Sequence, residues 1–240
     1  MSNPGFQFKQ FYVRHDQCAM KVGTDGVLLG AWAGENTTYP RILDIGTGSG
    51  LIALMLAQRF ERAQIIGIDI DIEASQQAHE NFHASPWHTR LQVQHTALQD
   101  FSVNEEGLFD LIVSNPPFFQ NSLKNPNSQR STARHTDTLP HSVLLASVAR
   151  LLKEDGRFCV ILPTDLTDSL LQTALQYGLY EQRRLEVYPT PQRPCKRILL
   201  DFGKKKSVFP LQEKLIIEME GRHNYSPEYR QLTSSFYLHQ

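Results

Sequence analysis

The chain is predicted to be an α/β protein, with a mostly parallel sheet covered by helices on both faces. Three observations predict this class. Short apolar runs alternate with amphipathic stretches, a glycine-rich turn follows one of the first apolar runs, and no repeat or low-complexity block interrupts the alternation. Strands separated by helices pair in parallel, because each crossover returns the chain to the same edge of the sheet.

The expected strands are short apolar runs bounded by turn residues. They cover residues 41–44, 64–69, 91–94, 109–114, 157–163, 185–188 and 197–202. The expected helices cover residues 51–59, 72–83, 142–152 and 166–177. Ser142 is the expected N-cap of the third helix. Ligands of such sheets bind at the carboxyl ends of the strands, so the loops after Asp44 and Ser114 are expected to face one crevice.

Composition narrows the class of protein further. Hydrophobic residues make up 40% of the chain and the net charge is −1, so a nucleic acid would have to be bound by a local basic patch. Cys18, Cys159 and Cys195 form no CxxC pair and are odd in number, which favours a reduced, cytoplasmic setting without disulfides or zinc. The apolar run at 51–57 is too short for a bilayer, and the first residues lack the layout of a signal peptide.

The stretch LDIGTGSGL indicates a ligand-binding turn. It places three glycines between a strand and a helix, namely Gly46, Gly48 and Gly50. Glycines allow positive φ and close approach of a ligand, although a tight turn without a ligand is the alternative interpretation. Leu51 stands where a dinucleotide fingerprint requires glycine, which disfavours a nicotinamide cofactor. Asp69 ends the next strand and can bind a ribose, whereas Asp71 can be the N-cap of the following helix.

The loop NPPF, formed by Asn115, Pro116, Pro117 and Phe118, is the second candidate site. The amide oxygen of Asn115 and the rigidly held carbonyl of Pro116 can accept two hydrogen bonds from a planar NH₂ group. Phe118 can stack on the attached ring. A turn with buried prolines is the structural alternative, but the position at the crevice favours a clamp for an exocyclic amine. Acceptors that pull on the amine protons expose its otherwise delocalised lone pair.

These motifs together carry a family resemblance. LDIGTGSG, GIDID and VSNPPF resemble the class I S-adenosylmethionine-dependent methyltransferases. Residues 8–32 and 224–238 resemble the terminal signatures of the bacterial tRNA1(Val) (adenine-37 N(6))-methyltransferases. The resemblance implies a Rossmann-like fold with a seven-stranded, mostly parallel sheet. It also implies an N-terminal segment, residues 1–35, that packs on the cofactor pocket, followed by a methyltransferase domain at 36–240.

The resemblance also implies roles for particular residues. Gly46 and Gly48 are expected to contact the amino-acid part of S-adenosylmethionine, Asp44 its amino group, and Asp69 with Ile70 its ribose region. Asn115 and Pro116 are expected to hold the target amine. Lys21, Thr24 and Asp25 are expected to border the pocket. Many relatives carry an acid where this chain has Ala97, so the cofactor adenine is expected to bind the backbone of Ala97 and Leu98, or Asp100.

A base inside tRNA has to be extruded to reach such a pocket, and an anticodon loop lowers that cost. Basic residues after the NPPF loop are candidates for RNA binding: Lys124, Arg130 and Arg134. A later basic group consists of Arg193, Lys196, Arg197 and Lys204 to Lys206. Each of these cations can equally be an ordinary solvated side chain.

Several alternatives stay open at this point. Ribosomal guanine N(2)-methyltransferases and protein-glutamine methyltransferases use related loops, and an RNA-binding module with an inactive pocket is a rival from another class. His79 and His83 share a helix face but lack an HExxH pattern, so no metal site is expected. Ser114 stands outside a GxSxG motif, which argues against a hydrolase.

Overall fold

The structure is a computed structural model that describes residues 4–18, 20–35, 38–102, 107–117, 139–221 and 223–238. Its strands are β1 Gly5–Gln7, β2 Tyr12–Arg14, β3 Arg41–Ile45, β4 Gln64–Asp69, β5 Leu91–His95, β6 Phe109–Ser114, β7 Leu152–Pro163, β8 Tyr180–Tyr188, β9 Arg197–Gly203 and β10 Leu211–Ile216. Its α-helices are α1 Thr24–Trp32, α2 Leu51–Arg59, α3 Ile72–Ala84, α4 Leu98–Ser102, α5 His141–Leu151, α6 Thr167–Gln176 and α7 Pro227–Thr233.

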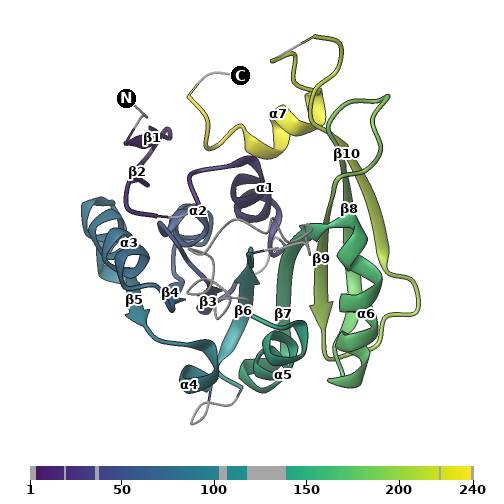
Figure 1. The fold of residues 1–240 in the computed structure, drawn as a ribbon, viewed down its shortest axis with the longest axis horizontal. Coiled ribbons are helices and arrows are strands. Elements are labelled where there is room, and N and C mark those ends of the chain that lie inside the picture. Colours follow the sequence, from purple (N-terminus) through teal and green to yellow (C-terminus); the bar gives the residue numbers. More distant parts are fainter. Residues whose placement is uncertain are drawn as a thin grey trace, which may run out of the picture.

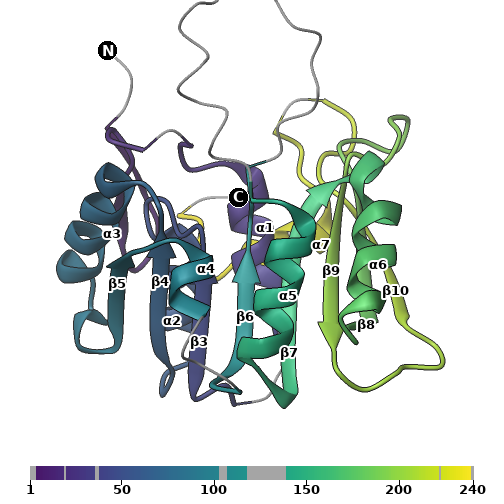
Figure 2. The same ribbon diagram turned by 60° about the horizontal axis from the view of Figure 1, so that its bottom comes forward.

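One sheet dominates the molecule, in the order β10-β8-β9-β7-β6-β3-β4-β5, and only β9 runs antiparallel to its neighbours (Figures 1 and 2). The predicted α/β class with a mostly parallel sheet is confirmed. The number of strands in the sheet was wrong, because β10 adds an eighth beside β8. Charged residues such as Glu213 and Lys214 interrupt the apolar pattern of this edge strand, which hides it in the sequence.

Two apolar clusters lie on the two faces of the sheet. One face packs against α1, α2, α3 and α7 together with the N-terminal residues, and includes Phe8 and Phe11. The other face packs against α4, α5 and α6. Figure 2 shows α4, α5 and α6 together on one side of the strands. The predicted coverage of both faces is therefore confirmed. Among the described helices, none combines the length and apolar composition that a bilayer crossing requires.

The strand order reverses at β3, which pairs with β4 on one side and with β6 on the other. Ile45 and Ser114 are register partners at the carboxyl ends of β3 and β6, and the Ser114 hydroxyl donates to the Ile45 carbonyl at 2.9 Å. The glycine loop and the NPP residues therefore leave the sheet side by side. This confirms the expectation of a shared crevice at the switch point.

Two helix ends test the capping predictions. Asp71 is the N-cap of α3, and its side chain accepts hydrogen bonds from the N–H groups of Glu73 and Ala74. The prediction for Ser142 was wrong, since α5 begins at His141 after Pro140. Proline fixes φ near the value that a helix entry needs, so the helix begins there without a side-chain cap.

Helix α1 packs against α2 through two glycines, Gly26 and Gly30. A Cβ at Gly26 would come within 3.0 Å of Leu51 Cδ2, and one at Gly30 within 2.7 Å of Met55 Sδ. Two glycines four residues apart lie on one helix face, so they let the helices approach where any side chain would obstruct. The packing brings the first turn of α1 to the carboxyl edge of the sheet.

Candidate active site

A cleft of about 810 Å³ opens at the carboxyl edge of the central strands. One wall consists of the residues directly before α1 and the first turn of that helix, and another of the glycine loop after β3 with the start of α2. The residues after β6, the last residue of β7 and the first residue of β9 complete the cleft. Residues predicted for the site that line it are Lys21, Thr24, Asp25, Gly46, Gly48, Asn115, Pro116 and Arg197. Segments that are far apart in the sequence thus meet at one site.

The three glycines of the loop have different physical roles. All three have positive φ, at 69° for Gly46, 56° for Gly48 and 80° for Gly50. A Cβ at Gly46 or Gly48 would meet nothing within 4 Å, whereas one at Gly50 would overlap the ring of Phe82. Gly46 and Gly48 therefore present bare backbone to the cleft, as a closely bound ligand requires, and Gly50 serves packing.

Asp44 is fully buried at the end of β3. Its Oδ2 accepts hydrogen bonds from the Thr47 hydroxyl at 2.7 Å and from the Ala53 N–H at 3.2 Å. Its Oδ1 has no hydrogen-bond partner among the described residues. Burial raises the pKa of Asp44 to about 7, and the bonds from Thr47 and Ala53 only partly offset this. A buried carboxylate with an unused oxygen suits an ammonium group.

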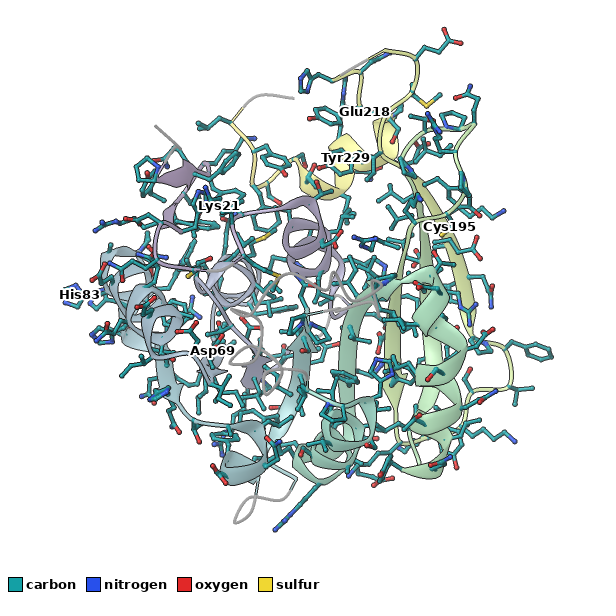
Figure 3. The ribbon with its side chains drawn as sticks, in the orientation of Figure 1. Lys21, Asp69, His83, Cys195, Glu218 and Tyr229 are labelled. Atoms are coloured by element: carbon teal, nitrogen blue, oxygen red, sulfur yellow. The ribbon has the colours of Figure 1, made fainter. Side chains whose placement is uncertain are left out.

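Asp69 shapes the glycine loop at the end of β4. Its Oδ2 accepts the Gly48 N–H at 2.8 Å and its Oδ1 accepts the Asp71 N–H at 2.9 Å. Burial raises the pKa of Asp69, while these backbone bonds oppose the shift. Each carboxylate oxygen has a second lone pair, so a ribose hydroxyl can still bind. Figure 3 labels Asp69 and Lys21 on the same half of the molecule.

Five residues predicted for cofactor binding do not line the cleft: Asp44, Asp69, Ile70, Ala97 and Leu98. Ile70 is exposed after β4. The Ala97 carbonyl, directly before α4, accepts the Phe101 N–H at 3.0 Å and the Thr96 hydroxyl at 3.3 Å, so both of its lone pairs already have donors. Asp100, the other candidate for the adenine, lines a separate cavity with Arg41.

The NPPF loop is described only in part. Asn115 and Pro116 line the cleft, and Pro117 is exposed. Predicted residues that lie outside the described part of the chain are Phe118, Lys124, Arg130 and Arg134.

The later basic group divides between the two ends of β9. Arg197 begins β9 at the cleft, where its Nε donates to Asp25 Oδ2 at 2.7 Å. Arg193 and Lys196 are exposed on the preceding turn. Lys204 to Lys206 follow β9 at the opposite edge of the sheet, the whole length of the strand away, roughly 20 Å. The six cations therefore do not form one basic group, because the length of β9 separates them.

Two buried amides that the sequence did not single out hold the N-terminal residues beside the glycine loop. Asn81 accepts the Arg14 N–H at 2.9 Å and donates to the carbonyls of Arg14 and Ser49, each at 2.8 Å. Gln77 accepts the Gln17 N–H at 2.8 Å. Their spacing of four residues resembles a solvated helix face, and only the tertiary contact shows that both are buried.

The two histidines that share a face of α3 lie at the surface. His79 and His83 are exposed, and Figure 3 shows His83 pointing away from α3. In the described ranges, no three side chains of the metal-binding types gather into a site.

The class of protein follows from this fold and from comparisons. The model of the methyltransferase small domain matches residues 27–177. A predicted O-methyltransferase from Agrobacterium tumefaciens has a similar fold, with a TM-score of 0.65 and 16% identity over 88% of this chain and 96% of that chain. The chain is a methyltransferase by fold and family model.

Relatives define the family more closely. The tRNA1(Val) (adenine(37)-N6)-methyltransferase of Bacteroides thetaiotaomicron is 50% identical over 100% of this chain and 99% of its own length. That of Bacteroides fragilis is 52% identical over 99% of each chain. The chain belongs to the family of tRNA1(Val) (adenine(37)-N6)-methyltransferases.

Proposed function

We propose that this protein transfers a methyl group from S-adenosylmethionine to the exocyclic amine of adenine 37 in tRNA1(Val), giving N(6)-methyladenosine. One observation carries the proposal. Asn115 and Pro116 line the same cleft as Gly46 and Gly48, on strands that are direct neighbours at the switch point. Acceptors for an amine and a cofactor site within one cleft suit direct transfer of a group between the two ligands.

The residues present fit the cofactor. Gly46 and Gly48 leave open space where side chains would stand, and the unpaired oxygen of Asp44 suits the ammonium of an amino acid. Lys21 and Thr24 stand at the uncapped first turn of α1, which favours a carboxylate. When bound, S-adenosylmethionine supplies an electrophilic methyl group on a sulfonium.

The substrate side rests on Asn115 and Pro116. Their carbonyl oxygens can accept both protons of an adenine amine, which turns the nitrogen lone pair out of the ring and toward the cofactor side of the cleft. No dedicated general base is needed first, because the amine proton becomes acidic once nitrogen is alkylated.

Phe118 is proposed to stack on the adenine ring. The RNA backbone is proposed to meet Arg193, Lys196 and Arg197 at the cleft edge, with Lys124, Arg130 and Arg134 as further contacts.

Transcripts of tRNA1(Val) with adenine or guanine at position 37 test this function directly. We expect methyl transfer only to the adenine transcript, with N(6)-methyladenosine as the product identified by mass analysis of nucleosides. Transfer to ribosomal RNA or to a protein glutamine instead would favour the rival methyltransferases. An absence of saturable S-adenosylmethionine binding would favour the inactive RNA-binding module.

Asn115→Ala should lower the single-turnover methylation rate by about a hundredfold or more, because one preorganised acceptor at the reacting group is lost. The affinity for S-adenosylhomocysteine should stay within a few-fold of wild type. Near-normal turnover in this variant would remove the amine clamp from the proposal.

A further inference from the structure

We propose that Arg197, held in place by Asp25, binds a backbone phosphate of the target nucleotide and so orients its base toward Asn115. The inference rests on the proposed function and assigns one residue of the cleft to the substrate. Arg197 differs from the other exposed cations of its turn because its side chain lines the cleft wall, whereas Arg193 and Lys196 are outside the lining.

The guanidinium of Arg197 is oriented by two acceptors. Its Nε donates to Asp25 Oδ2 at 2.7 Å, and its Nη1 donates to the Lys196 carbonyl at 3.0 Å. Nη2 makes no hydrogen bond to another described residue, so donors of a planar fork remain for an incoming anion. A fork of this kind matches the geometry of a phosphate.

The order of the strands places Arg197 on the substrate side of Asn115. The glycine loop follows β3, Asn115 follows β6, and Arg197 begins β9, with β7 between β6 and β9. Pro163 at the end of β7 is the register partner of Arg197. Two strand spacings separate β6 from β9, roughly 10 Å. That is within reach of the phosphate of a nucleotide whose amine lies at Asn115. Strand β9 also lies on the opposite side of β6 from β3, which carries the glycine loop.

The setting of the pair also favours a ligand contact over a purely structural one. The side chains of Arg197 and Asp25 are 35% and 30% exposed, and both face the cleft. The structural ion pair of the same strand is different, since Asp201 is fully buried beneath Arg157. The pair at the cleft wall exposes both partners to solvent, where an anion can approach, whereas the carboxylate of the other pair is closed to solvent.

Binding of a tRNA1(Val) anticodon stem-loop across a series of salt concentrations tests the inference. For Arg197→Ala we expect the slope of log K against log salt to fall in magnitude by about one, and affinity to fall about tenfold. Arg197→Lys should keep the slope, because the charge remains, but should bind more weakly because the fork is lost. Lys206→Ala is the matched control, since it removes one charge at the opposite end of β9 and should leave slope and affinity unchanged.

Three further measurements separate the possible roles. With Arg197→Ala, the affinity for S-adenosylhomocysteine should be unchanged and the loss should lie in KM for RNA. Asp25→Asn should keep the salt slope and raise the KM for RNA a few-fold, because the guanidinium of Arg197 is no longer held in one orientation. Thermal midpoints near wild type would show that each variant folds.

The possible failures are distinguishable. An unchanged salt slope in Arg197→Ala, or a weakened affinity for S-adenosylhomocysteine, would overturn the phosphate assignment while leaving methylation by the wild-type protein intact. If the Asp25→Asn variant binds RNA as tightly as the wild-type protein, the role of Asp25 is overturned. A wild-type protein that methylates no adenine 37 would instead overturn the proposed function itself.

Discussion

Asp44 shows at the scale of a single residue how the end of a strand can bury a carboxyl group with one oxygen left unpaired among the described residues. The chain folds its carboxyl group into the interior at the end of β3 and gives it only two donors, Thr47 and Ala53. The remaining oxygen is left without a partner among the described residues. Because burial disfavours the charged form, the pKa of Asp44 rises to about 7 and the ligand-free protein keeps the proton at mildly acidic pH.

S-adenosylhomocysteine should therefore bind more tightly as the pH rises from about 5.5 toward 7, and the gain should level off above that. The sign follows from linkage: a bound ammonium needs an ionised Asp44, so binding expels the proton that the free protein holds below its pKa of about 7. Isothermal titration in buffers of different ionisation enthalpy would measure both the affinity and the released proton.

Asp44→Asn is the control for this prediction. It should bind S-adenosylhomocysteine more weakly and should lose the proton release across the same pH range. A wild-type affinity that is flat between pH 5.5 and 7 would contradict the pairing of Asp44 with the ammonium.

At the scale of elements, the site depends on how closely α1 lies on α2. Gly26 and Gly30 allow the approach, and the N-terminal turn of α1 then forms one wall of the cleft. At its other end, the guanidinium of Arg59 donates to the carbonyls of Gly30 and Ala33 at 2.9 and 2.6 Å, which caps the helix. Helix α1 is thus fixed along its side and at its end.

Gly30→Ala should lower the free energy of unfolding by about 1–2 kcal/mol. Overpacking against Met55 costs about 1–3 kcal/mol, and the better helix propensity of alanine returns up to about 1 kcal/mol. Urea denaturation followed by circular dichroism measures the change.

Gly203→Ala is the matched control, because its Cβ would lie 3.4 Å from Gln182 Cγ, an ordinary contact distance. It should change the free energy of unfolding by no more than about 0.5 kcal/mol. A Gly30→Ala protein as stable as wild type would show that α1 can shift away from α2 without loss.

At the scale of the whole molecule, a buried charge network joins the outer strands to α1. Arg157 of β7 donates two bonds of 2.8 Å to Asp201 of β9. Arg183 of β8 lies 3.9 Å from the same carboxylate, stacks over the ring of Trp32 at 3.9 Å and donates to the Trp32 carbonyl at 3.0 Å. The network connects the end of α1 to strands far from it in sequence.

Asp201→Ala should destabilise the protein by about 3–5 kcal/mol, because it leaves the guanidinium of Arg157 without its buried partner. Asp155→Ala removes the partner of Lys205 in a solvent-exposed pair, and should leave the stability close to that of wild type. Chemical denaturation of both variants gives the comparison. Equal losses of unfolding free energy in the two variants would contradict the conclusion that the buried network stabilises the protein more than the exposed pair.

Much of the fold could be predicted because it follows from local pattern. The seven apolar runs became β3 to β9, and the helices at 51–59 and 72–83 agree with α2 and α3 within a residue. Asp71 was recognised as a possible cap because capping depends on neighbouring backbone alone. Strand β10 was missed, since an edge strand needs apolar residues on only part of its length, and Ser142 was overruled by the proline two residues before it.

What the sequence determined by itself was the set of candidate site residues: a glycine loop without the dinucleotide spacing, an acid at the end of each of two strands, and an asparagine before two prolines. Strand and turn signals of this kind act over a few residues, so they can be recognised without the fold. Only the tertiary structure decided that Arg197 pairs with Asp25 at the cleft wall while Lys204 to Lys206 lie at the other end of β9, and that Asn81 joins the N-terminal residues to the glycine loop. These contacts join residues 32 to 172 positions apart, so strand order and direction bring them together.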